Sequence, residues 1–399
     1  MNTRKYLQQV LLTGDDNKWK IAQIGEIFNY EQPNKYIVQD TNYKEVGIPV
    51  LTANKSFILG YTDEQEGVYQ NTPVIIFDDF TTMSKYVDFP FKVKSSAMKI
   101  LKPKNSEYDI KFVFERMQLI PFAIGQHKRF YLSEYQFVDI KLPPLSEQKQ
   151  IVSIIEKWDK YIELLDKKIE IKKNTKKYLQ QVLLTGKVRL KGYDGEWEER
   201  KLGEIGEFKT SSVDKKIREG EQMVSLVNYM DVYKHKRINN STKEDFMKVS
   251  AKDEQLISNN LLKGDILFTP SSETPEDIGH SVVIEEDLSN TVYSYHVMRF
   301  RPNIELDLLF SHYFCNHPAV LRQFSRYSSG VTRFTLSLDS FSRVKVVIPP
   351  LSEQKAISSI LTKSDKEIKT LEKQKQLIEQ QRKYLINNLV TGKIRINGN

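Results

Sequence analysis

The sequence Pro-Pro-Leu-Ser-Glu-Gln-Lys occurs twice in this chain, at residues 143–149 and again at residues 349–355. A second block follows each copy at the same distance: residues 177–186 read KYLQQVLLTG and residues 383–392 read KYLINNLVTG. Two such blocks repeated in the same order indicate an internal duplication. The two halves of the chain are therefore expected to share one structural plan.

A third copy of the second block opens the chain, because residues 5–14 match residues 177–186 letter for letter. This third copy lacks the Pro-Pro-Leu-Ser-Glu-Gln-Lys motif and the segment that precedes the other two copies. We interpret residues 1–14 as a partial scaffold helix that closes a nearly circular arrangement, lying beside the distal end of the main helices. The alternative is a remnant of recombination that frays in solution.

The segment from each Pro-Pro motif to the following Gly has the spacing of a long helix. Apolar residues recur alternately four and three positions apart, which is the pattern of a heptad seam. Ser146 is the expected N-cap, and Gly186 and Gly392 are the expected C-terminal stops. The seam positions that define the predicted scaffold are Ile151, Ile155, Trp158, Ile162 and Leu165 in the first copy, and Ile368, Leu371, Ile378 and Leu385 in the second.

Rods of about 40 residues and roughly 60 Å with interrupted seams are not stable alone. We therefore expect the two to pack as a long antiparallel coiled coil. The alternative is two unrelated surface helices on separate domains.

The segments between the helices differ from each other in sequence and length and are predicted to be mixed α/β domains. Short β-branched runs at residues 74–77, 266–268, 282–284 and 344–348 predict strands, and residues 306–324 have helical spacing. The predicted fold class is α+β, with two mixed α/β domains joined by two long helices in a pseudo-two-fold arrangement. The expected organisation is a partial scaffold helix at 1–14, domains at 15–142 and 187–348, and scaffold helices at 143–186 and 349–399.

Composition is that of a folded protein with a modest positive charge. The 399 residues include 60 Lys and Arg against 52 Asp and Glu, a formal net charge of +8 that suits a polyanionic partner without requiring one. Cys315 is the single cysteine, so no internal disulfide can form. The sequence has no signal peptide and no long apolar run, which predicts a reduced cytoplasmic protein with no membrane contact.

No catalytic constellation emerges from the motifs. The chain has no Gly-Lys-Ser or Gly-Lys-Thr phosphate loop, no Asn-Pro-Pro-Tyr run and no Gly-rich cofactor loop. Residues 147–149 match a nuclease-like Glu-x-Lys pattern but begin a predicted helix twice, and Asp78 with Asp79 fits a strand-to-loop turn better than a metal pair. We expect no catalytic residues, no metal and no cofactor.

Several loops carry side chains suited to double-stranded DNA. Arg and Lys suit phosphates and guanine edges, Gln suits adenine, and hydroxyl groups bridge both. The candidate DNA-binding residues are Ser84, Lys85, Tyr86, Gln126, His127, Lys128 and Arg129 in the first domain, and Lys236, Arg237, Ser271, Ser272, Arg326, Thr332 and Arg333 in the second.

Taken together, these motifs resemble the specificity subunits of Type I restriction-modification systems. The resemblance rests on both Pro-Pro-Leu-Ser-Glu-Gln-Lys boundaries, the helix endings at residues 182–186 and 389–392, the run at residues 197–205, and the strand at residues 264–269 with the later Ser329-Gly330. It covers essentially the whole chain. One departure is the fragment at residues 1–14, since many members of the family begin directly with the first recognition domain.

The resemblance implies two target recognition domains, each reading half of a bipartite DNA sequence, with the helix length setting the spacer between the half-sites. It also implies two methyltransferase subunits docked on the helices to methylate adenine, and restriction subunits as further partners. Whether a nuclease subunit is present stays open. The other readings are a coiled-coil adaptor protein without DNA specificity, and an enzyme with unrecognised motifs.

Overall fold

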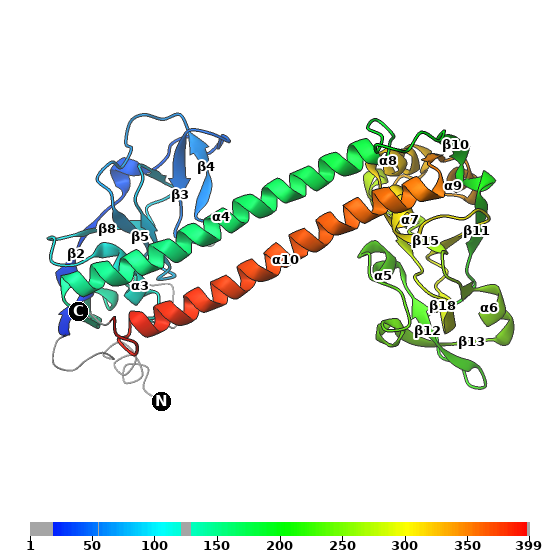
Figure 1. Cartoon of the computed structure of the whole chain (residues 1–399). Coiled ribbons are helices and arrows are strands. Elements are labelled where there is room, and N and C mark those ends of the chain that lie inside the picture. Colours follow the sequence, from blue (N-terminus) through cyan, green and yellow to red (C-terminus); the bar gives the residue numbers. More distant parts are fainter. Residues whose placement is uncertain (1–18, 55, 121–128, 397–399) are drawn as a thin grey trace. The chain divides into compact units, whose positions relative to one another are not determined.

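The computed structural model describes residues 19–54, 56–120 and 129–396 (Figure 1). Two compact units make up the chain: unit 1 contains Met1–Asp166 and Lys373–Asn399, and unit 2 contains Lys167–Glu372. Each of the two long helices, α4 (Leu145–Leu183) and α10 (Leu351–Leu389), contributes one part to each unit. In the part of the chain that is described, no helix is long and apolar enough to cross a membrane.

Unit 1 is built on a four-stranded antiparallel sheet with the order β2-β8-β5-β6. A second sheet has the order β4-β3-β7, and β1 pairs with β9 in a two-stranded ribbon. Its elements are β1 (Lys20–Gln23), α2 (Ile24–Ile27), β2 (Phe28–Glu31), β3 (Ile48–Leu51), β4 (Ile58–Thr62), β5 (Val74–Asp78), β6 (Ser84–Val87), β7 (Lys92–Val93), β8 (Met98–Pro103), α3 (Ile110–Met117) and β9 (Asp139–Leu142).

Unit 2 repeats the four-stranded sheet in the order β11-β19-β15-β17 and adds a four-stranded sheet in the order β13-β12-β18-β14. Strand β10 pairs with β21, as β1 pairs with β9 in unit 1. Its elements are β10 (Glu198–Lys201), β11 (Gly206–Thr210), β12 (Gln222–Val227), α5 (Tyr229–Tyr233), β13 (Met247–Ala251), α6 (Asp253–Ser258), β14 (Asn260–Leu261), β15 (Ile266–Phe268), β16 (Ser271–Ser272), β17 (Ser281–Val283), β18 (Leu288–Tyr293), β19 (Met298–Pro302), α7 (Leu308–Cys315), α8 (Pro318–Tyr327), β20 (Phe334–Thr335), α9 (Leu338–Ser342) and β21 (Lys345–Ile348).

The two long helices pack against each other in opposite directions within each unit. In unit 1, Arg382 binds Asp159 at 2.5 Å and Lys375 binds Asp166 at 2.6 Å. In unit 2, Lys172 binds Glu367 at 2.8 Å, and Lys176 binds Asp365. In both units the residue number falls along one helix as it rises along the other, so the predicted antiparallel packing is confirmed.

The glutamine of the repeated Pro-Pro-Leu-Ser-Glu-Gln-Lys motif makes equivalent hydrogen bonds in both units. Gln354 is buried; its amide donates to the carbonyl of Pro349 at 2.9 Å, and its Oε1 accepts from the backbone N–H of Asp307 at 2.9 Å. Asp307 in turn caps α7 by accepting from the N–H of Phe310. In unit 1 the equivalent residues Gln148, Pro143, Asp109 and Phe112 make the same contacts.

The glutamate of each motif holds the end of the other long helix. Glu353, whose side chain is 1 % exposed, accepts two hydrogen bonds from the Arg189 guanidinium at 2.7 and 2.8 Å and one from the Trp197 indole at 2.9 Å. Glu147 likewise binds Arg395, with both distances 2.9 Å. We call each motif glutamate together with the arginine that it binds a socket. Gly186 and Gly392 lie in the turns that follow α4 and α10, three residues past the helix ends, with φ of +67° and +70°. Arg189 and Arg395 come three residues after these glycines.

Three details of the predicted elements differ from the structure or lie outside it. Helix α4 begins at Leu145, so Ser146 is inside the first turn and is not the N-cap. The helical run at residues 306–324 is two helices, α7 and α8, because Pro318 has no N–H to continue α7 and begins a new helix instead. The fragment at residues 1–14 lies outside the described residues, and its closure role stays a prediction.

Candidate nucleic-acid interface

In unit 2 the predicted residues Ser271 and Arg333 come together at the end of the central strand β15. The chain leaves β15 at Phe268 and forms the short strand β16, which pairs with β20. The Arg333 guanidinium donates to the Ser271 hydroxyl at 3.0 and 3.3 Å. The Tyr229 hydroxyl donates to the Ser271 carbonyl at 2.8 Å. Ser271 is buried, and these contacts fix the exposed Arg333 guanidinium above it, in reach of a DNA phosphate.

The loop before β20 presents further groups to solvent. Gly330 has φ of +149°, and a Cβ there would lie 2.0 Å from the Arg333 carbonyl oxygen, so this turn requires glycine. Val331 is 92 % exposed, and Thr332 and Arg333 are also exposed. A methyl-bearing side chain next to a hydroxyl and a guanidinium provides both apolar and hydrogen-bonding contacts for a DNA groove.

Unit 1 has a related arrangement where β5 ends. The Asp79 carboxylate accepts from the backbone N–H of Tyr131 at 2.9 Å and from the Tyr30 hydroxyl at 3.4 Å, and it thereby holds the segment that follows exposed Arg129. Burial, reinforced by Asp79, raises the pKa of Tyr30 to about 12, so this phenol stays protonated and donates. Gln126, His127 and Lys128 lie outside the described residues.

A buried lysine sits beside the same site. Lys99 is 1 % exposed; its ammonium donates to the Gln32 side chain at 2.8 Å and lies 5.9 Å from the centre of the Tyr30 ring. Burial lowers the pKa of Lys99. Sequence inspection missed Tyr30, Lys99 and Tyr229, because no local pattern separates them from ordinary strand and helix residues.

Ser84, Lys85 and Tyr86 lie together on the edge strand β6 of unit 1. Ser84 is buried and accepts from the Gln118 side chain at 2.9 Å. The Lys85 ammonium is 5.9 Å from the Phe57 ring centre, and the Lys111 ammonium lies 4.8 Å from the Tyr86 ring centre. Only part of this predicted set is therefore open to a ligand.

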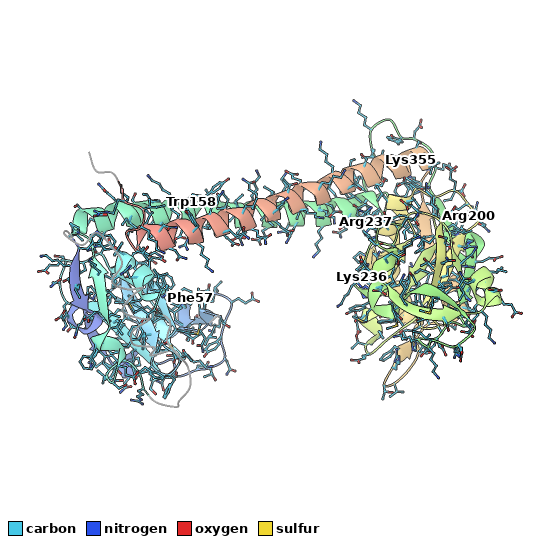
Figure 2. The ribbon with its side chains drawn as sticks, turned by 90° about the horizontal axis from the view of Figure 1, so that it is seen from below. Phe57, Trp158, Arg200, Lys236, Arg237 and Lys355 are labelled. Atoms are coloured by element: carbon cyan, nitrogen blue, oxygen red, sulfur yellow. The ribbon has the colours of Figure 1, made fainter. Side chains whose placement is uncertain are left out.

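In unit 2, Lys236 and Arg237 follow α5 and are labelled in Figure 2. Lys236 binds Asp231 at 2.5 Å, and Arg237 forms a bidentate pair with Glu285 at 2.6 and 2.8 Å. Their charges are thus partly neutralised within the unit. Ser272 is buried and bonds to the Thr274 carbonyl. Arg326, on the last turn of α8, lines a separate pocket of about 360 Å³ together with Thr185, Lys345 and other residues.

The predicted scaffold seam residues are buried or partly buried. Ile151, Ile155, Leu165, Ile368 and Leu371 are buried, and Trp158, Ile162, Ile378 and Leu385 are partly buried. Trp158 and Leu385 line a groove, described below. A direct role of these residues in binding partners stays a prediction.

Replacing Arg333 by Ala is expected to weaken DNA binding by about tenfold and to lower the slope of log affinity against log salt by about one, as predicted for a side chain that binds one phosphate. Arg237→Ala is the matched control, since Glu285 already engages that guanidinium. Affinity for target DNA, measured over a salt series with the partner subunits present, checks this. Equal losses in both variants would contradict the assignment.

Three histidines of unit 2, His235, His280 and His312, lie close together. The His235 and His280 rings are 5.3 Å apart, and the His235 and His312 rings 6.5 Å apart. Burial lowers the pKa of both His235 and His312. The His235 ring and Lys176 lower the pKa of His312 further, while Asp365 and Glu285 oppose this. The His280 ring lowers the pKa of His235 further, and the hydrogen bond to the Ser281 carbonyl opposes this.

We expect unit 2 to lose stability as the pH falls below about 6.5, the ordinary histidine value. In that range His312 binds a proton in the unfolded chain but not in the folded chain, because its pKa is lower in the folded state. The extra proton bound by the unfolded chain favours unfolding. Urea midpoints between about pH 7 and pH 5 should therefore fall, and His312→Gln should reduce the slope. An unchanged slope in the variant would exclude His312 as a source.

Comparisons with known proteins give a consistent result. The sequence model for the "Type I restriction modification DNA specificity domain" matches residues 16–173 and 194–380. The chain is 41 % identical over 221 residues to the Type I restriction enzyme EcoR124I/EcoR124II specificity subunit of Escherichia coli, a match spanning 52 % of each protein. It is 25 % identical to the MjaVIII specificity subunit of Methanocaldococcus jannaschii, covering 95 % of this chain and 93 % of that one.

Two solved structures share the fold. A Type I restriction-modification S subunit from M. genitalium has a TM-score of 0.56 at 16 % identity, covering 94 % of this chain and 97 % of that one. A chain from a structure of complex assembly and conformational transition in the Type I system has a TM-score of 0.60 at 14 % identity, covering 95 % and 99 %.

Proposed function

Because this chain belongs to the Type I restriction-modification DNA specificity family, we propose that it reads a split, asymmetric DNA target and carries methyltransferase subunits on α4 and α10. Units 1 and 2 would each read one half of the target. DNA sequence recognition is the task of a specificity subunit, which is not itself an enzyme. Methylation of adenine, and cleavage where restriction subunits join, would be the work of partner chains.

The observation that carries this proposal is one framework with two different reading surfaces. Both units contain the same four-stranded antiparallel sheet and the same socket contacts. The loops at the strand ends differ: buried Ser271 after β15 holds exposed Arg333, whereas buried Asp79 after β5 holds the segment that follows exposed Arg129. Different exposed side chains beside the two sheets favour different base sequences, and hence unlike half-sites.

The chemistry of adenine methylation supplies a reason for separate reading and catalytic subunits. A methyltransferase reaches an adenine by extruding it from the duplex, at a cost of a few kcal/mol. A rigid reader that holds the flanking DNA offsets this cost through its own contacts.

Methylation mapping of a host that carries this chain and its methyltransferase tests the proposal. We expect modified adenines in a motif of two unlike specified parts separated by unspecified bases, and loss of all of them when this chain is deleted. A continuous palindromic motif, or methylation that survives the deletion, would contradict the proposal.

A further inference from the structure

A groove of about 420 Å³ opens between α4 and α10 in unit 1. Trp158 from α4 faces Leu377, Tyr384 and Leu385 from α10 across it, with Gln380 and Gln381 completing the lining. Trp158 is labelled on α4 in Figure 2. Leu377 and Tyr384 are 50 % and 67 % exposed, so large apolar surface is presented to solvent on a helix whose opposite face is packed.

The same pair of exposed residues occurs in unit 2. The internal duplication relates residues 206 positions apart, from Pro143 to Pro349. By this relation Leu377 and Tyr384 correspond to Ile171 and Tyr178 on α4, which are 64 % and 59 % exposed. In each case the two side chains are seven residues apart and share one helix face. An exposed apolar pair repeated on two scaffold segments fits two copies of one partner.

The helix that faces the exposed pair differs between the two units. Along α4 in unit 1 the sequence presents Trp158, Tyr161 and Leu164, of which the last two are exposed. The corresponding residues of α10 in unit 2 are Ser364, Glu367 and Thr370. Ser364 bonds to the Ile360 carbonyl, Glu367 binds Lys172 at 2.8 Å, and Thr370 bonds to the Lys366 carbonyl. Unit 2 therefore keeps the exposed pair and lacks the aromatic side of the groove.

We propose that the two methyltransferase subunits bind with unequal affinity, the tight site being the Trp158 groove of unit 1 and the weak site the Ile171 and Tyr178 face of unit 2. This inference rests on the proposed function. Aromatic anchors dominate the energetics of protein interfaces, and the unit 1 site offers both Trp158 and Tyr384, whereas the unit 2 site offers Tyr178 with Ser364 in place of the tryptophan. The complex then forms in two steps, and a complex with one methyltransferase accumulates when that subunit is limiting.

Titration of the full chain with the methyltransferase subunit of the same system, followed by native mass spectrometry, tests this. We expect two dissociation constants separated by at least about tenfold. Trp158→Ser should weaken the first step by about tenfold to a hundredfold and bring the two constants together. Ser364→Trp is the reciprocal variant and should tighten the second step.

A matched pair of variants assigns the steps to the units. Tyr384→Ala should weaken the tight step, and Tyr178→Ala the weak one. Two equal steps that Trp158→Ser leaves unchanged would overturn the inference while leaving the proposed function intact. Self-association of the chain alone that Trp158→Ser abolishes would also overturn it, because the groove would then hold a second copy. No methyltransferase binding to the unaltered chain would instead contradict the proposed function.

Discussion

Replacing Glu353 by Gln is expected to destabilise unit 2 by about 3 kcal/mol, the scale observed when one partner of a buried ion pair is removed. Glu353 lies at the start of α10 and accepts three hydrogen bonds, two from Arg189 and one from Trp197. Glutamine keeps the shape of the side chain but turns one acceptor into a donor that faces other donors. The end of α4 and the start of α10 would lose their shared anchor.

Glu147→Gln provides the matched control in unit 1. Glu147 accepts from Arg395, but its side chain is more exposed, at 14 % against 1 % for Glu353. The Trp19 indole N–H has no hydrogen-bond partner among the described residues, whereas the Trp197 indole donates to Glu353. We therefore expect a smaller loss of about 1 kcal/mol. Urea unfolding followed by tryptophan fluorescence measures both variants, and equal losses would contradict this account of the sockets.

The sequence predicted the scaffold well because its signals are local or repeated. Heptad spacing defines helices by itself, and the duplicated motif shows that both belong to one design. The sockets were not predicted, although an Arg stands three residues after both Gly186 and Gly392. Arg189 and Glu353 are 164 positions apart, and no local pattern indicates which arginine meets which glutamate.

The candidate interface was predicted as a set of residue types and not as a set of contacts. Ser271 and Arg333 were both chosen for their chemistry, but their contact across 62 positions depends on the pairing of β16 with β20. Lys236 and Arg237 were chosen for the same chemistry, yet Asp231 and Glu285 bind them. Charge on a loop indicates what a residue can bind, while the folded neighbours determine whether it is available.

Exchanging one recognition domain should change one half of the methylated motif completely. The ends of each domain meet in a two-stranded ribbon: Gln23 pairs with Asp139 in unit 1, and Lys201 with Lys345 in unit 2. Directly inside each ribbon, the N–H of Ile24 donates to the Val138 carbonyl at 3.1 Å, and that of Leu202 to the Val344 carbonyl at 2.9 Å. A domain can therefore be replaced at residues 24–138 or 202–344 with the ribbon and socket kept.

The replaced domain carries its own loops, so its base contacts leave with it, while the contacts of the other domain stay. The two exchanges serve as controls for each other, since each should alter the half that the other leaves unchanged. Loss of all methylation in both exchanges, with normal methyltransferase binding, would indicate that the domains do not read independently.

The most direct test of the central claim is a map of methylated adenines for the chain with residues 24–138 exchanged for those of another family member. The account predicts that one specified part of the motif is new and that the other is identical to the part read by the unaltered chain. A map in which both parts change together, or in which neither changes, would contradict it.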